Sequence, residues 1–389
     1  MKLRNLLAGA VGIIMGMSVI FSVPVVSMAQ EQEEAVTADI QEHLWELDES
    51  MSDEEFLKLA TRNFKIVQSM ELLFDEDSYF QYYKAMTHLK QNAEGSREEF
   101  LEKQNNLVMK QTVADGVWYV WPEGKIPGID GESFTEEELD ASALDGYGFR
   151  PLVVKCLLND PSTAKGNILA IAGGAGSNRS NSAEAYPAAE VFNDLGYNVF
   201  VLQYRISPYS GDYGYMDAQR AVRLIKYYGE KEGYGGMDMI AAVGWSAGSG
   251  RVKGLINNLY GYLTPKDVYC SSYEPDEIDA ISSDLDVAML LYGPGELNPE
   301  NPNWPACYIC AGSEDDKGFN GGDGAATGSR KMYEAIKDTV PAMVNIIEGA
   351  GHGFGVGQEG AAKSTPECAL WPAQADEFMQ ANRGFQQNR

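Results

Sequence analysis

One serine of the sequence lies where a catalytic nucleophile would lie. Ser246 is at the centre of residues 244–248 (Gly-Trp-Ser-Ala-Gly), a G-x-S-x-G pattern that follows the apolar run 239–243 and precedes a helix-compatible segment, 252–259. In a strand–turn–helix context this pattern holds the serine hydroxyl above the edge of a sheet, and the two glycines leave room across the sharp turn. The following helix points its N-terminus at the same place, which favours developing negative charge. We therefore expect Ser246 to be a nucleophile; an unreactive serine in a glycine-rich turn is the alternative for so short a pattern.

The candidate base is a histidine. A serine hydroxyl is a weak nucleophile at neutral pH, so it needs a base and an acid that orients the base. The sequence has three histidines, of which His43 and His88 belong to polar, helix-like segments near the N-terminus. His352 lies instead in a glycine-rich loop directly after a predicted strand and follows Ser246 in the chain. We expect His352 to be the base, and the other two to be surface or packed side chains.

The candidate acid comes from a loop between these two residues. In serine hydrolases with this elbow, the acid lies between the nucleophile and the histidine in chain order, on a loop after a strand. Glu314, Asp315 and Asp316 occupy such a loop. We assign the acid to Asp315 and keep Asp316 as the alternative; a solvated acidic loop is the non-functional interpretation.

An oxyanion hole requires two backbone N–H groups that face the developing negative charge. The N–H of Ala247, next to the nucleophile, is one candidate. The other is expected from the glycine-rich loop 173–176, at Gly174 or Ala175. Such a loop could instead bind a nucleotide phosphate, but the G-x-G-x-x-G spacing and the lysine–serine pair of a P-loop are absent. The sequence therefore predicts no cofactor.

Five cysteines follow the N-terminal apolar stretch, and their pairing is left open by the sequence. Cys307 and Cys310 have the spacing of a metal or redox pair. They lie in an apolar run typical of a strand, however, where positions three apart face opposite sides of a sheet. We interpret them as core residues and expect no metal site.

The order of predicted elements indicates the fold class. From residue 111 onward strands and helices alternate, which is typical of a mostly parallel central sheet with helices on both faces. The expected strands are 117–121, 149–158, 168–172, 198–204, 239–243, 287–292, 306–311 and 343–347. The expected helices are 183–195, 216–228, 252–259, 330–339 and 372–379. The sequence thus predicts an α/β catalytic domain over residues 111–389.

The N-terminal third divides into two further parts. Residues 1–29 combine a positive start, the apolar stretch 6–26 and small residues at 27–29, as in a cleaved signal peptide. We expect a secreted or extracytoplasmic protein, with a retained membrane anchor as the alternative. Residues 30–110 have helical periodicity and possible capping boxes at Ser52/Glu55 and Ser96/Glu99, so they predict a helical module.

The charge of the chain limits its partners. Its 57 acidic and 30 basic residues leave a net charge of −27, which disfavours nucleic acid and anionic membranes and is compatible with a neutral substrate. The oligomeric state is left open.

Taken together, these motifs resemble the α/β-hydrolase superfamily, and within it bacterial exported esterases related to acetyl xylan esterases and other carbohydrate deacylases. The motifs that carry the resemblance occur in the family's order, at 121–124 (Trp-Pro-Glu-Gly), 171–175 (Ile-Ala-Gly-Gly-Ala), 204–205 (Tyr-Arg), 217–223 (Asp-Ala-Gln-Arg-Ala-Val-Arg), 244–248, 312–315 (Gly-Ser-Glu-Asp) and 351–355 (Gly-His-Gly-Phe-Gly). The resemblance implies an α/β-hydrolase fold and a triad of Ser246, Asp315 and His352. In these families the acid usually stands three residues after a glycine such as Gly312.

We therefore expect an exported serine hydrolase that cleaves carboxylic esters through an acyl-enzyme, acting on an acylated carbohydrate or another small ester. A peptidase or lipase on the same fold is the first alternative. A non-catalytic binding protein on a hydrolase scaffold is the second, although such proteins usually lose a triad residue or an elbow glycine, and this chain keeps them.

Overall fold

The computed structural model describes residues 44–385, apart from 45, 49, 72–73, 109–115, 142–148, 294–300, 302–303, 317–322 and 359–362. The predicted signal peptide, 1–29, and His43 lie outside the described residues. Within the described ranges, no helix has the length and apolar character needed to cross a membrane.

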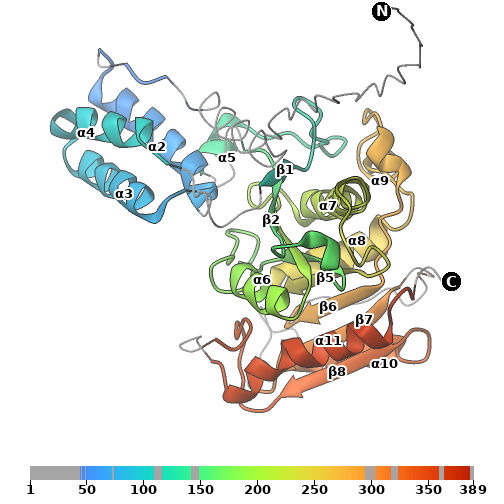
Figure 1. The fold of residues 1–389 in the computed structure, drawn as a ribbon. Coiled ribbons are helices and arrows are strands. Elements are labelled where there is room, and N and C mark those ends of the chain that lie inside the picture. The colour runs from blue at the N-terminus through green and yellow to red at the C-terminus, as the bar shows by residue number, and fades with distance from the viewer. Residues whose placement is uncertain are drawn as a thin grey trace, which may run out of the picture.

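An eight-stranded sheet forms the centre of the larger domain (Figure 1). Its strands are β1 (Val117–Tyr119), β2 (Leu152–Cys156), β3 (Asn167–Ile171), β4 (Asn198–Gln203), β5 (Ile240–Trp245), β6 (Val287–Leu291), β7 (Ala306–Gly312) and β8 (Ala342–Ile347). They lie in the order β1-β2-β4-β3-β5-β6-β7-β8, and β2 runs antiparallel to both of its neighbours while every pairing from β4 to β8 is parallel. A parallel sheet is covered on both faces, which explains why its strands are continuous apolar runs.

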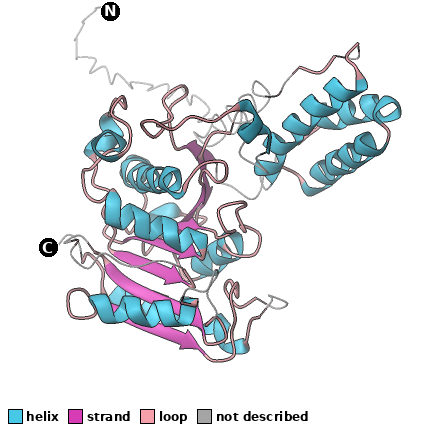
Figure 2. Cartoon of the chain, turned by 180° about the vertical axis from the view of Figure 1, so that it is seen from behind, coloured by secondary structure: helices cyan, strands magenta, loops and turns pink. Residues whose placement is uncertain are grey.

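Two apolar clusters cover the two faces of the sheet. Alternate residues of a strand point to opposite faces, so Ile168 of β3 packs in one cluster and Leu169 in the other. The longer helices of this domain are α6 (Ala185–Asp194), α7 (Gly211–Glu232), α8 (Ala247–Asn258), α10 (Ala325–Ile336) and α11 (Trp371–Ala381). Two shorter helices are α5 (Glu136–Ala141) and α9 (Pro265–Val268). Single 3₁₀ turns lie at Pro161–Thr163, Glu277–Ala280 and Pro366–Leu370. Helices α6 and α11 pack with the first cluster, and α7, α8 and α10 with the second (Figure 2). The predicted fold class is confirmed.

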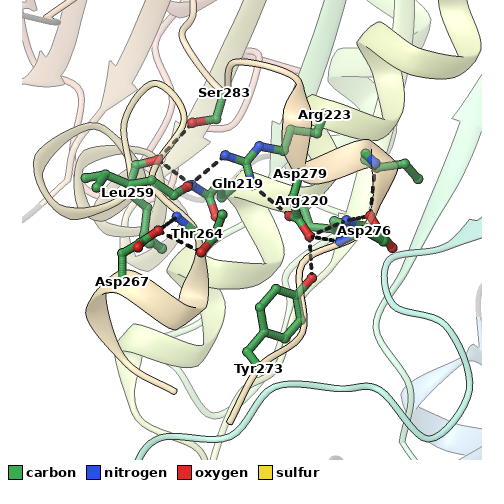
Figure 3. Close-up of polar contacts among 12 residues, drawn as sticks. Gln219, Arg220, Arg223, Leu259, Thr264, Asp267, Tyr273, Asp276, Asp279 and Ser283 are labelled. Carbon is green, nitrogen blue, oxygen red and sulfur yellow. Dashed lines mark hydrogen bonds and ion pairs between the residues drawn. The ribbon is translucent and has the colours of Figure 1, made fainter. Parts of the chain in front are cut away.

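A buried polar cluster attaches α7 to the segment that follows α8 (Figure 3). The Arg223 guanidinium donates to Asp279 over 2.8 Å, and the Tyr273 hydroxyl donates to the same carboxylate over 2.7 Å. Arg220 binds Asp276 with both terminal nitrogens. Arg220, Arg223 and Asp279 are almost fully buried, and the two arginines are balanced by Asp279 together with the partly exposed Asp276.

Three helices that precede the sheet in the chain pack against one another: α2 (Asp53–Ser69), α3 (Glu76–Gln91) and α4 (Ala93–Asn105). Figures 1 and 2 both show them beside one another and set apart from the sheet. Ser52 caps α2 as predicted, because its Oγ accepts from the Glu55 N–H. The predicted cap at Ser96 is wrong: α4 begins earlier, since the Asn92 side chain accepts from the Gly95 N–H. The boundary predicted at residue 110 falls among residues that are not described.

Candidate active site

Ser246 lies in a strained turn between β5 and α8. Its backbone has φ 49° and ψ −117°, a conformation that a non-glycine residue adopts only when its surroundings enforce it. The two flanking glycines are required by space: a Cβ on Gly248 would lie 1.9 Å from the Ile171 carbonyl oxygen, and one on Gly244 would lie 2.6 Å from the Gly248 carbonyl. The turn is held by the Ser246 N–H, which donates to the Leu291 carbonyl over 2.9 Å.

A histidine and a carboxylate join this serine in one hydrogen-bonded chain. His352 Nε2 lies 2.9 Å from Ser246 Oγ, and His352 Nδ1 lies 2.7 Å from Asp315 Oδ2. The three residues follow β5, β7 and β8, and the carboxyl ends of parallel strands meet at one edge of the sheet. Asp315 is 8% exposed, so its negative charge faces the imidazole more than it faces water. This geometry fits a base oriented by an acid and in contact with a nucleophile.

The reserve acid, Asp316, is used elsewhere. Its Oδ1 accepts from the N–H and hydroxyl of Thr327, at 3.1 and 2.7 Å, near the start of α10. The two adjacent carboxylates therefore have different partners: Asp315 contacts His352, and Asp316 binds Thr327 near the start of α10.

The loop after β3 lies against the nucleophile. A Cβ on Gly173 would lie 2.9 Å from Ser246 Cβ, and the next two residues have positive φ, 125° at Gly174 and 55° at Ala175. In the described part of the chain, the N–H groups of Gly174 and Ala175 donate to no protein acceptor. Ala247 is the first residue of α8, where an N–H has no partner within its own helix. These three N–H groups are the candidates for binding an oxyanion.

Two residues at this site were missed from the sequence. Glu184, at the start of α6, is 5% exposed and accepts from the Gly173 N–H over 2.6 Å and from the Tyr292 hydroxyl over 2.9 Å. The Tyr292 ring contacts the His352 ring edge-on, with the centroids 4.9 Å apart. Burial raises the pKa of the Glu184 carboxyl, while the two donors and His352 act in the opposite direction. No spacing in the sequence marks these residues, because only the fold brings them together.

The other residues singled out in the sequence lie away from this site. His88 is exposed on α3 and contacts Glu99 over 3.2 Å. All five cysteines are buried, and none of them forms a disulfide bond. Cys307 and Cys310 lie on β7 and pack on opposite faces of the sheet, as the strand interpretation predicted. Among the residues that the structure describes, no three His, Cys, Asp or Glu side chains gather in a way that could hold a metal ion.

No protein-family model and no curated protein matches this chain. Among solved structures, it is similar to the acetyl ester-xyloside bifunctional hydrolase from Caldicellulosiruptor lactoaceticus, at 20% identity and a TM-score of 0.52, over 70% of this chain and 98% of that one. A thermophilic esterase from Thermogutta terrifontis has 19% identity and a TM-score of 0.48, over 67% of this chain and 96% of that one. Together with the strand order, the first similarity shows that this chain has the α/β-hydrolase fold, as the sequence motifs predicted.

Proposed function

We propose that this protein is a serine hydrolase that cleaves carboxylic esters. The observation that carries the proposal is the continuous hydrogen-bonded chain from Asp315 through His352 to Ser246, with contacts of 2.7 and 2.9 Å. A strained serine backbone at the tip of an elbow supports it, because strain of this kind persists where the surrounding structure enforces it and clusters at active sites.

The geometry supports a two-step acyl transfer. Ser246 Oγ attacks the ester carbonyl carbon while His352 Nε2 takes the hydroxyl proton, and the N–H groups of Ala247 and of Gly174 or Ala175 bind the resulting oxyanion. The intermediate collapses as His352 returns the proton to the leaving alcohol, which gives an acyl-enzyme. A water molecule, deprotonated by His352, then attacks the acyl carbon; the bond from this carbon to Ser246 Oγ breaks as His352 returns the proton to Oγ, and the carboxylic acid leaves. Asp315 keeps the Nδ1 proton in place and stabilises the imidazolium that forms in each step.

We further propose that the substrate is an acylated carbohydrate or another small ester and that the enzyme acts outside the cytoplasm. The first part is supported by the sequence resemblance to carbohydrate deacylases and by the name of the hydrolase from Caldicellulosiruptor lactoaceticus, which acts on acetyl esters and xylosides according to that name. The second is supported by the composition of residues 1–29. The strongly negative charge of the chain favours a neutral substrate over an anionic one.

A substrate panel tests the proposal. Purified protein is assayed with p-nitrophenyl esters of rising acyl length, with acetylated xylan and with an aminoacyl-arylamide, beside the Ser246→Ala variant. We expect hydrolysis of short esters and release of acetate from xylan, both lost in the variant. Preference for the arylamide would indicate a peptidase, and preference for long acyl chains a lipase. Absence of any Ser246-dependent hydrolysis would refute the proposal.

A further inference from the structure

A second carboxylate lies close to the nucleophile and takes no part in the proton transfers described above. Glu184 is nearly fully buried, and Gly173 separates it from the nucleophile. A Cβ at Gly173 would lie 3.1 Å from Glu184 Oε2 and 2.9 Å from Ser246 Cβ, so only the missing side chain of a glycine lets the two approach. Each oxygen of the carboxyl group accepts one hydrogen bond, from the Gly173 N–H and from the Tyr292 hydroxyl. This arrangement of two donors is suited to the ionised form.

Tyr292 connects this carboxylate to the loop that carries the histidine. It directly follows β6, is fully buried and has φ 34°, in the left-handed region that a bulky residue rarely adopts. Its hydroxyl donates to Glu184 and accepts from the Gly355 N–H over 3.2 Å. The Gly355 carbonyl in turn accepts from the Trp371 indole N–H over 3.0 Å. The His352 loop is therefore fastened three residues beyond the imidazole, through the side chain of Tyr292.

Among the described residues, no permanent cation compensates the charge of Glu184. In the described part of the chain, no lysine or arginine lies within ion-pair distance of it. Within hydrogen-bond distance of Glu184 lie the Gly173 N–H after β3 and the Tyr292 hydroxyl after β6, and the Tyr292 ring in turn contacts the imidazole of His352, which follows β8. The groups that contact His352 include Asp315, Ser246 and the Tyr292 ring. A buried carboxylate is costly unless paired, and the imidazolium formed during turnover is the positive charge that this arrangement provides.

We propose that Glu184 and Tyr292 are a positioning pair for the proposed hydrolysis: they hold the oxyanion loop and the His352 loop in register, and Glu184 stabilises the imidazolium alongside Asp315. This inference rests on the proposed function. The hydrogen bonds of Glu184 and Tyr292 join the oxyanion loop to the His352 loop. The relative position of these two loops decides whether the oxyanion donors and the base face the same carbonyl group. Small misplacements of this kind cost large factors in rate, because the donors must meet the charge as it develops.

Three variants separate charge from geometry. Glu184→Gln removes the charge and keeps the size. Glu184→Asp keeps the charge on a side chain too short to reach both donors, and Tyr292→Phe keeps the ring and removes the link to Gly355. Asp279→Asn is the matched control, because it neutralises an equally buried carboxylate in the polar cluster of Figure 3.

The readouts are kcat, KM, the pH at which kcat/KM is half-maximal on its acid side, and melting temperature. For Glu184→Gln we expect kcat to fall about ten-fold with KM changed less than about two-fold, because binding is untouched while the transition state loses stabilisation. Its acid limb should move to lower pH, since loss of a neighbouring negative charge disfavours the imidazolium. Glu184→Asp and Tyr292→Phe should also lose kcat but leave the acid limb near its wild-type position. Asp279→Asn should lower the melting temperature alone.

The outcomes distinguish this inference from the proposed function. If wild-type protein hydrolyses esters and Glu184→Gln retains its kcat and acid limb, the positioning pair is refuted while the function stands. If Glu184→Gln and Asp279→Asn lose kcat equally and the acid limb of kcat/KM does not shift, Glu184 has only a structural role. That result would also refute the positioning role of Glu184 and Tyr292. If the wild type hydrolyses no ester, an NMR titration of His352, identified by comparison with His352→Gln, still tests the charge coupling. A shift of that titration to lower pH in Glu184→Gln supports the inference, and an unchanged titration refutes it.

Discussion

The two neighbouring aspartates of one loop allow a sharp test of the triad. Asp315→Asn and Asp316→Asn make the same chemical change one residue apart. Asp315 Oδ2 lies 2.7 Å from His352 Nδ1, whereas Asp316 binds Thr327. In Asp315→Asn, the amide N–H₂ group competes as a donor toward Nδ1, which places the imidazole proton on Nε2, where it blocks acceptance of the Ser246 proton. The imidazolium also loses its nearest counter-charge.

The expected magnitudes differ by several orders. A change of this type at a triad acid costs about 10⁴-fold in kcat, or about 5.5 kcal/mol of transition-state stabilisation at roughly 1.4 kcal/mol per ten-fold. Since Asp315 is 8% exposed, little solvent is available to replace its charge, and the full effect is expected. Asp316→Asn weakens hydrogen bonds to Thr327, so it should cost about 1 kcal/mol of folding stability and change kcat by less than about two-fold.

The assay is steady-state hydrolysis of p-nitrophenyl acetate at saturating substrate, with circular dichroism melts to show that both variants are folded. Loss of activity in Asp316→Asn with retention in Asp315→Asn would show that the other carboxylate orients the base. Full activity in both variants would mean that no carboxylate of this loop acts on His352.

Three further predictions concern the nucleophile, its neighbouring loop and the proposed signal peptide. Ser246→Ala should abolish ester hydrolysis with an unchanged melting temperature, and wild-type turnover in this variant would rule out the serine mechanism. Gly173→Ala would place a Cβ 2.8 Å from the Trp245 carbonyl oxygen, so the loop must shift and kcat should fall at least about ten-fold, whereas Gly128→Ala, with no atom within 4 Å of its new Cβ, should leave kcat unchanged. Mass spectrometry of the purified protein should find a mature chain that begins near Gln30, as cleavage of the proposed signal peptide requires; full-length chain in the membrane fraction would indicate a retained anchor instead.

Local patterns in the sequence were sufficient for the fold class and for most elements. The alternation of apolar runs with helical segments specified strands close to those observed, because burial on both faces of a parallel sheet imposes a composition that is visible along the chain. The ends of two helices differ from those expected. Helix α4 begins at Ala93 rather than near Ser96, since the Asn92 side chain accepts from the Gly95 N–H and caps the first turn. Helix α7 runs from Gly211 to Glu232, well beyond the segment 216–228 expected from its pattern.

The sequence by itself determined which residue types could form the site: a serine between two glycines, one histidine outside the helical module and a short acidic loop. Each of these features can be recognised from the sequence alone. The sharp turn requires the two glycines, His352 is the one histidine outside the helical module, and the acid must lie between the serine and the histidine in chain order. Only the tertiary structure decided between Asp315 and Asp316, since adjacent residues of a loop point in different directions and the register of β7 against β8 sets which one meets His352. It also brought Glu184 to Tyr292, 108 residues apart, across the ends of β3 and β6. Contacts between distant segments depend on how strands are ordered in the sheet, and no local pattern records that order.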